Sequence, residues 1–414
     1  MAPGKQTPKF EAKKTRRERV EDAPTSRSRV RPGGPGVPFH RPYLRQAEEE
    51  AVLRVLRSGW LATGPESAQF EQEFAAYVGA AHAIAVSSCT AAMHLALRVA
   101  GIGRGDEVVT SVNTFCATVE AIVHAGARPV LADVEEDTLN ISPQQIEAKL
   151  TPRTRALLSV DLAGHPCDMD SIRAIAERHG LVVIGDAAHS LSARYRGCRV
   201  GSQADLTAFS FYVTKPLSTG EGGMVTTDRE DWAERLRVLR LHGMSRDAWR
   251  RYESARSWYY EVGELGYKYN LSDLQAALGR VQLRRQEALR RRRAEIAEAY
   301  REALSGVPGV RLPTERPDVL HSWHLFIVRV CDGNGSSLRD RVIRDLADRG
   351  IGASVHFIPI HYHPYYARRC RAKRGDFPVA EKAFEATLSL PIFPGMRQRD
   401  IRKVTDVLKS AIGA

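Results

Sequence analysis

Short runs of β-branched and other apolar residues alternate with longer segments of helical periodicity through the first half of the chain. Strict alternation of strand and helix is typical of βαβ units, in which parallel strands form one sheet with helices on both faces. The pattern therefore predicts an α/β fold with a mostly parallel sheet. The expected strands are residues 83–87, 107–111, 129–133, 156–160 and 182–185, and the expected helices are residues 90–99, 118–124, 143–150 and 169–179.

The pattern changes in the second half of the chain. Two more strands are expected at residues 208–212 and 223–227, around a glycine-rich turn, and a long helical zone follows at residues 271–304. After the breaker residues 306–309, we expect a strand at 324–330, a helix at 338–349, a strand at 352–357 and a helix at 398–412. Because linkers collect Gly and Pro, we place a boundary near Ser305, between a large domain (37–305) and a small C-terminal α+β domain (306–414).

Basic residues concentrate at the N-terminus. The 414 residues carry a formal charge of +12, and residues 1–32, with ten Lys or Arg against four acidic residues, supply half of it. Residues 1–36 are polar and aperiodic and end in a Pro/Gly run, so we interpret them as a disordered basic arm. The remaining charge is ordinary for an enzyme with an anionic substrate, and no nucleic-acid partner is expected. We interpret the run Arg290–Arg293 as the solvated face of a helix.

Targeting and redox features are inconspicuous. The chain has no run of eighteen apolar residues and no apolar stretch after its N-terminal charges, so neither a membrane span nor a secretory signal is expected. Its six cysteines are scattered without a CxxC pair, which argues against a disulfide framework or a metal site. We therefore expect a cytoplasmic protein.

Two residues at predicted strand ends are candidates for catalysis. Asp186 follows an apolar strand, where open α/β sheets bind ligands, and a carboxylate there can pair with a protonated ring nitrogen. The alternative for Asp186 is a cap on the next helix. Lys215 lies directly after another strand and before Pro216, where partial burial would lower its pKa and favour the nucleophilic amine. The alternative for Lys215 is an exposed lysine at a turn.

Three further positions suit a phosphorylated aromatic cofactor. Cys89 and Thr90 lie where a strand turns into a helix, whose N-terminus can bind phosphate, although a plain N-cap is an equal alternative. Ser210 lies on the strand before Lys215 and can donate to phosphate or bond to the backbone. Phe115 lies at a strand end, where it can stack on a pyridine ring or belong to the core.

Six stretches together resemble one family. From Leu56 to the C-terminus the chain is similar to the DegT/DnrJ/ArnB group of nucleotide-sugar aminotransferases. These enzymes have the aspartate-aminotransferase fold, which is fold type I of the pyridoxal-phosphate enzymes. The stretches are residues 58–65, 87–97, 185–190, 209–223, 266–273 and 321–324. The chain departs from the usual pattern at Gly185, where the family often has Glu, and in its Gly-Tyr-Lys-Tyr-Asn loop (266–270).

The resemblance implies a cofactor, pyridoxal 5'-phosphate, and a role for each matching residue. Lys215 would form the Schiff base with the cofactor and move the proton, Asp186 would pair with the pyridine nitrogen, and His189 would contact the phenolic oxygen. Cys89, Thr90 and Ser210 would hold phosphate. Phe115 would stack on the ring. The 266–270 loop would reach the phosphate of the other subunit of a homodimer. Because this loop departs from the usual pattern, either Lys268 or Asn270 could make that contact.

The resemblance also implies two substrates, glutamate as amino donor and a nucleotide-linked keto sugar as acceptor. The stretches 266–273, 321–326 and 350–352 with His356 are most similar to those of the UDP-4-keto-pentose enzymes, including the UDP-4-amino-4-deoxy-L-arabinose aminotransferases. The alternatives are an aminotransferase for a dTDP-deoxyhexose or an amino-cyclitol, and a non-catalytic regulatory protein with the same fold. The candidate substrate residues are Trp60, Thr63, Tyr212, His324 and His361.

Overall fold

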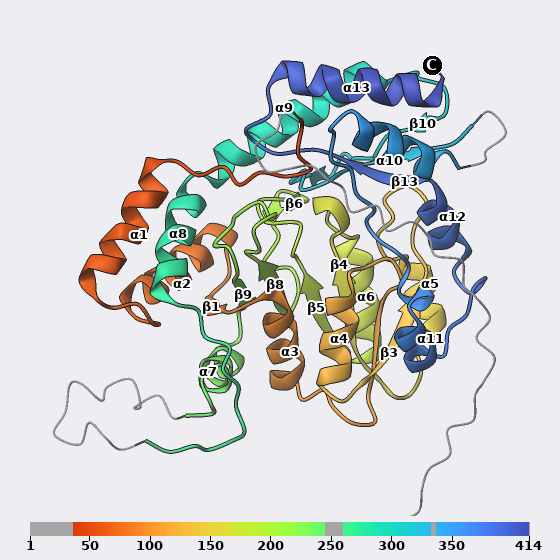
Figure 1. The fold of residues 1–414 in the computed structure, drawn as a ribbon. Helices are drawn as coiled ribbons and strands as arrows, with labels where there is room; N and C mark the ends of the chain where they lie inside the picture. Colours follow the sequence, from red (N-terminus) through yellow and green to blue (C-terminus); the bar gives the residue numbers. More distant parts are fainter. Residues whose placement is uncertain (1–35, 245–259, 333–336, 414) are drawn as a thin grey trace, which may run out of the picture.

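A seven-stranded sheet forms the centre of the molecule (Figure 1). The computed structural model describes residues 36–244, 260–332 and 337–413. The strand order is β1-β9-β8-β5-β4-β2-β3, and only β9 runs against the other six strands. The predicted mostly parallel α/β sheet is thus confirmed. Its strands are β1 His82–Val86, β2 Glu107–Ser111, β3 Arg128–Ala132, β4 Thr154–Val160, β5 Val182–Asp186, β8 Leu206–Ser210 and β9 Gly223–Thr227.

Helices cover both faces of this sheet because successive strand residues point to opposite sides. Val108 and Leu158 pack on one face with α3, α4 and α7, whereas their neighbours Val109 and Leu157 pack on the other with α5 and α6. These helices are α3 Cys89–Val99, α4 Cys116–His124, α5 Pro143–Lys149, α6 Met169–His179 and α7 Glu230–Leu239.

Further helices cover the β1 end of the sheet, where they share a hydrophobic core with β1, β8 and β9. The predicted helical zone is two helices, α8 (Asp273–Arg284) and α9 (Gln286–Leu304), which meet at Arg285. Helices α1 (Gln46–Ser58) and α2 (Pro65–Val78), which were not among the expected elements, pack against α8. No helix in the described ranges is long and apolar enough to cross a membrane.

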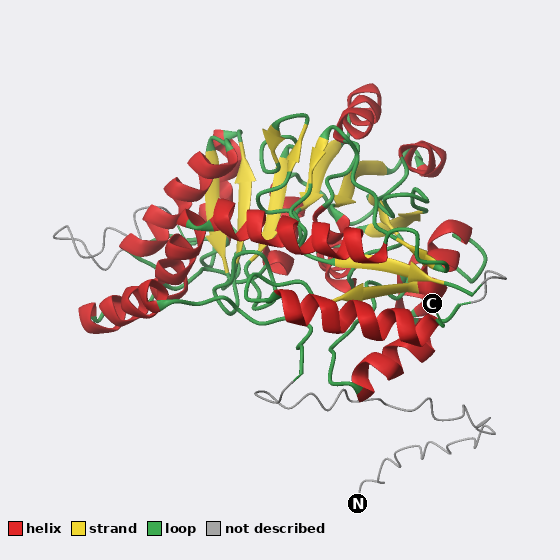
Figure 2. Ribbon diagram, turned by 90° about the horizontal axis from the view of Figure 1, so that it is seen from above, coloured by secondary structure: helices red, strands yellow, loops and turns green. Residues whose placement is uncertain are grey.

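A second unit contains a three-stranded antiparallel sheet, β10 (Val310–Arg311), β12 (Phe326–Val330) and β13 (Thr387–Leu390). The prediction of a strand at residues 352–357 is wrong, because this segment makes only an isolated bridge between Ser354 and Ser389. Its last two residues, His356 and Phe357, line a cavity that is described below. Figure 2 shows the C-terminal helix beside the small sheet. The helices here are α10 Arg339–Asp348, α11 Pro364–Cys370, α12 Pro378–Ala386 and α13 Gln398–Ile412.

The two units share elements. Val37, which precedes α1, and Tyr300, which lies on α9, both belong to the hydrophobic core of the second unit. Val37 also forms a bridge with Ile351. Asp133, which follows β3, accepts hydrogen bonds of 3.0 Å from the N–H groups of Val379 and Ala380, so a carboxylate of the large unit caps helix α12. A division at residue 305 stays a prediction, and the arm predicted at 1–36 lies, except for Gly36, outside the described residues.

The basic run of α9 is divided between solvent and interior. Arg291 is exposed, whereas Arg293 retains only 2% of its accessible surface. A helix turns every 3.6 residues, so four consecutive positions cannot all face solvent when one side of the helix is packed. The interpretation of this run as a solvated face is therefore wrong for Arg293.

Candidate active site

A cavity of about 500 Å³ lies at the carboxyl ends of the parallel strands. Because these strands run in one direction, the residues that follow each of them meet at this edge. The large unit contributes Ser88, Cys89, Thr90, Thr114, Phe115, Asp186, His189, Ser210, Tyr212 and Lys215. The other side is formed by Phe39, His40, His324, Leu325, His356, Phe357 and Ile392.

Asp186 is fixed at the end of β5 by hydrogen bonds to both carboxylate oxygens. Its Oδ2 accepts a bond of 2.8 Å from Thr118 Oγ1, and its Oδ1 accepts one of 3.1 Å from the N–H of Ala188. Since Thr118 donates to Asp186, Thr114 must donate the 2.7 Å bond that joins the two threonines. Burial raises the pKa of Asp186, and the hydrogen bond from Thr118 opposes that rise. The side chain thus faces the cavity rather than capping a helix.

Lys215 lies in the turn between β8 and β9. Its main-chain N–H donates to the carbonyl of Tyr212 at 2.9 Å, which sets the turn, and its side chain lines the cavity. Burial lowers the pKa of Lys215 to about 8, although the nearby charge of Asp186 acts in the opposite direction. About a tenth of this amine is therefore neutral and nucleophilic at pH 7, which is far more than for a lysine of ordinary pKa.

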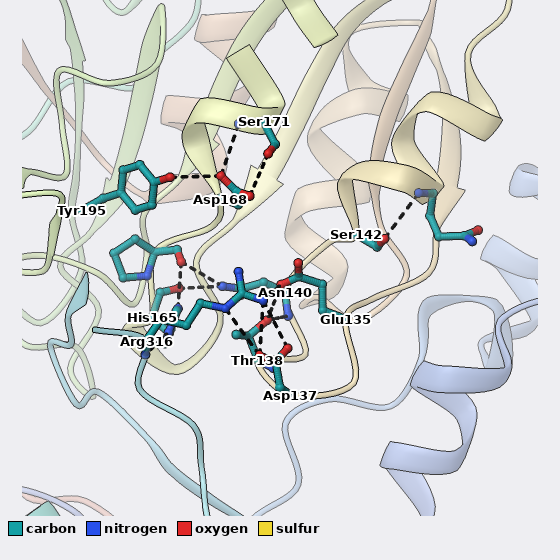
Figure 3. A network of polar contacts seen from close by, with 12 residues as sticks. Glu135, Asp137, Thr138, Asn140, Ser142, His165, Asp168, Ser171, Tyr195 and Arg316 are labelled. Atoms are coloured by element: carbon teal, nitrogen blue, oxygen red, sulfur yellow. Dashed lines mark hydrogen bonds and ion pairs between the residues drawn. The ribbon is translucent and has the colours of Figure 1, made fainter. Parts of the chain in front are cut away.

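His189 is held in a defined tautomer. Its Nδ1 accepts a hydrogen bond of 3.2 Å from the N–H of Ala163, so in the neutral ring the proton is on Nε2. Burial keeps the pKa of His189 well below its usual range, and the charge of Lys215 acts in the same direction. Asn140 supports this arrangement, because its Oδ1 accepts a hydrogen bond from the N–H of Leu162. Its amide group also donates to the carbonyl of His165 (Figure 3).

The candidates for phosphate binding lie where α3 begins. Ser88 caps this helix by accepting a 3.0 Å bond from the N–H of Ala91, and Thr90 lines the cavity one residue into the helix. A Cβ on Gly223 would lie 2.5 Å from the carbonyl carbon of Ser88, so only glycine lets β9 approach this turn. The thiol of Cys89 lies 3.8 Å from Asp186 Oδ1 and so is directed to the carboxylate. The group of Cys89 that can bind phosphate is therefore its main-chain N–H.

Two aromatic candidates also line the cavity. Phe115 is 57% exposed at the start of α4 and its ring lies 5.8 Å from that of Phe357, so it is not part of the core. Tyr212 is 44% exposed on the turn before Lys215. The ring of His324 lies 4.4 Å from that of His189.

Five predicted residues do not line the cavity of their own chain, and four of them lie on two neighbouring segments. Asn270 donates a 2.6 Å bond to Thr63 Oγ1, and Trp60 Nε1 donates to the carbonyl of Thr63 at 3.2 Å. Lys268 is exposed on the same loop as Asn270. Asn270 forms an antiparallel bridge with Val86 at the end of β1. Trp60, Thr63 and Asn270 thus form one hydrogen-bonded group, and Lys268 precedes Asn270 by two residues on the loop.

His361 lies elsewhere in the second unit. It is buried, and its Nε2 is 2.9 Å from Glu381 Oε1. Its ring packs at 4.8 Å from Phe377. The structure therefore does not bring His361 to the cavity, because this pairing holds it within the small unit.

Several residues of the site were missed by the sequence analysis. Thr118, in the first turn of α4, supports Asp186 from behind the cavity and does not line it. His356 and Phe357 were assigned to a strand, and His356 entered only through the family resemblance. In the structure, His356 Nδ1 lies 2.8 Å from Ser389 Oγ, and its ring stacks on Phe39 at 5.6 Å. No local periodicity distinguishes such irregular segments.

Comparison with known proteins gives a consistent result. Residues 42–409 match the model of the DegT/DnrJ/EryC1/StrS aminotransferase family. The chain is 50% identical over 377 residues to the spore coat polysaccharide biosynthesis protein SpsC of Bacillus subtilis, covering 91% of this chain and 97% of SpsC.

Solved structures agree with this match. DesV of S. venezuelae superposes with a TM-score of 0.84 at 40% identity, covering 92% of this chain and all of DesV. The putative sugar aminotransferase Spr1654 of Streptococcus pneumoniae, in its PLP-form, superposes with a TM-score of 0.85 at 31% identity, over 91% of this chain and 99% of Spr1654.

Proposed function

The chain belongs to the DegT/DnrJ/EryC1/StrS aminotransferase family, and from this premise we propose that it moves the amino group of glutamate to a nucleotide-linked keto sugar. It is a sugar aminotransferase, and pyridoxal phosphate is its cofactor. The observation that carries the proposal is the meeting of Lys215, with its lowered pKa, and the buried carboxylate of Asp186 in one cavity.

The residues of the cavity fit the cofactor. Asp186 offers a fixed carboxylate for a pyridinium N–H, and His189 offers an Nε2–H for an anionic ring oxygen. The first turn of α3 with Thr90, together with Ser210, offers donors for phosphate. Phe115 presents an exposed ring that can stack on a flat partner.

Bound pyridoxal phosphate supplies an aldehyde and an electron-accepting ring. The chain supplies the proton chemistry. Lys215 would react as a neutral amine, and its Nζ would then accept the proton that leaves the α-carbon of the amino donor and later deliver a proton to the sugar carbon that receives the amino group. Asp186, held by Thr118, keeps the ring nitrogen protonated, and the locked tautomer of His189 lets it donate but not accept at Nε2.

A sugar of a surface polysaccharide is the favoured kind of acceptor. The relative SpsC is named for spore coat polysaccharide biosynthesis, and the sequence resemblance favours a UDP-linked 4-keto sugar. A test is to incubate the holoenzyme and labelled glutamate with UDP- and dTDP-linked keto sugars. We expect transfer to at least one UDP-4-keto sugar. Transfer only to dTDP-deoxyhexoses would replace the acceptor, and no bleaching of the cofactor by glutamate would contradict the activity.

We also propose that two chains form each complete site. Lys268 and Asn270 do not line their own cavity, which is expected if they reach the phosphate of a two-fold partner. A mixture of inactive Lys215→Ala and inactive Lys268→Glu/Asn270→Ala proteins would then form hybrids with one intact site each. After verified subunit exchange, about a quarter of wild-type activity should return. Exchange without recovered activity would contradict the shared site.

A further inference from the structure

Arg293 is a buried cation without a counter-ion. Its Nε and Nη1 are buried and have no hydrogen-bond partner, and among the described residues no carboxylate pairs with it. Its neighbour Arg292 instead bonds to the carbonyl of Met396 at 2.6 Å and to Glu295 at 2.8 Å. Burying an unpaired guanidinium is unfavourable unless another group neutralises it. The position of Arg293 therefore points to an anion that the chain itself does not provide.

A small chamber lies against this side chain. Its volume is about 10 Å³, close to what one water-sized group requires. Its lining includes Arg293, His40, Lys215 and Ser218 and contains neither Asp nor Glu. His40 Nε2 is a second buried nitrogen without a partner.

The chamber adjoins the active site. His40 and Lys215 line both the chamber and the large cavity. A group bound in the large cavity near the Lys215 amine can therefore extend one polar atom toward Arg293. An amino acid that reacts at its α-carbon carries a carboxylate on that same carbon, one bond away from the reacting centre.

We propose that Arg293 binds a single anionic atom in this chamber, either one carboxylate oxygen of the amino donor or a free halide ion. The guanidinium supplies two N–H donors, and the absence of acidic groups from the lining favours an anion over a cation or a neutral solute. Only the assignment of the anion to the carboxylate of the amino donor rests on the proposed function, because halide binding requires no reaction.

The first experiment measures anion binding to the holoenzyme without turnover. Melting temperatures are recorded in increasing bromide, with gluconate keeping the ionic strength constant. We expect a saturable rise in wild type, because a ligand of the native state alone stabilises it. Arg291→Met, on the exposed side of the same helix and with the same charge change, should keep this rise, and Arg293→Met should lose it.

The second experiment identifies the source. If the donor carboxylate binds Arg293, Arg293→Met should raise the KM for glutamate about 10- to 100-fold and leave the KM for the keto sugar unchanged, and bromide should compete with glutamate. An unchanged KM with a lost bromide effect would assign the site to a free halide. A bromide effect without any transamination would leave the anion site standing while the proposed function fails.

One result would overturn the proposal. Arg293→Met that folds, responds to bromide as wild type does and keeps the wild-type KM for glutamate would show that Arg293 is only structural. If Arg293→Met does not fold, crystals of the wild-type holoenzyme with bromide decide the matter. An anomalous peak in contact with Arg293 would support the site, and no peak together with no bromide stabilisation would overturn it.

Discussion

The two sides of the cavity are built differently. The floor, which we define as Asp186, His189, Ser210 and Lys215, lies at strand ends and in the turns after them. The wall, which we define as His40, His324, His356 and Phe357, lies on irregular segments. On the floor, Asp186 accepts a hydrogen bond from Thr118, and His189 Nδ1 accepts one from the N–H of Ala163. On the wall, His40 Nε2 and His324 Nδ1 are buried and have no hydrogen-bond partner.

This difference separates positioning from recognition. A catalytic carboxylate and amine must keep one geometry, and a regular sheet with neighbouring donors holds them in place. The wall is polar but uncharged, because burial lowers the pKa of His356 to about 4 and that of His324 well below its usual range. Neutral imidazoles with free nitrogens suit the hydroxyl groups of a sugar. Floor variants should therefore change kcat, and wall variants should change the KM of the acceptor.

The largest effect is expected for Lys215→Ala. Turnover should fall by at least about 10³-fold, because the variant lacks the group that reacts with the cofactor and moves the proton. Steady-state rates measure the loss, and pyridoxal phosphate should still bind without a covalent bond. Transamination at a near wild-type rate would remove Lys215 from the mechanism.

Asp186→Asn should lower kcat by about 10²- to 10³-fold, because a neutral amide cannot keep the pyridine nitrogen protonated. Thr118→Ser, which retains the hydroxyl donor to Asp186 Oδ2, is the matched control and should lose little. Single-turnover kinetics with glutamate isolate the step. A small loss in Asp186→Asn would mean that the carboxylate only supports the fold of the floor.

On the wall, His324→Leu should raise the KM of the keto sugar about tenfold and change kcat by less than about threefold, because it removes one free hydrogen-bonding nitrogen. His361→Leu removes another buried histidine of the same unit, one that pairs with Glu381 outside the cavity. That control should lower stability but leave the KM unchanged. A large fall in kcat for His324→Leu would contradict the claim that the wall acts in recognition and the floor in catalysis.

The smallest effect concerns pH. Because the pKa of Lys215 is lowered to about 8, covalent capture of pyridoxal phosphate by the apoprotein should speed up with pH, with a midpoint near pH 8, and level off about one unit above it. Stopped-flow absorbance follows the capture. In Asp186→Asn the midpoint should move to lower pH, because the carboxylate charge that raises the Lys215 pKa is gone. A midpoint near the ordinary lysine value of 10.5 would contradict the burial of this amine.

The sequence determined the sheet and the chemistry at its edge. Apolar runs broken by helical periods place Asp186 and Lys215 after strands, and parallel strands bring their carboxyl ends together whatever the rest of the chain does. The same local logic located the turn at Thr90. It failed for residues 352–357, whose alternating pattern suits a strand, because β13 pairs with β12 in that place instead.

Only the tertiary structure decided the wall and the surroundings of the charges. His356 comes to the cavity through contacts with Ser389 and Phe39, which are distant in sequence and leave no periodic signal. His361 has the same residue type in the same unit, and its bond to Glu381 keeps it out. Arg291 and Arg293 are two residues apart in one basic run, but the packing of α9 exposes one and buries the other. Local sequence specifies which elements form, whereas long-range packing specifies which face of each is buried.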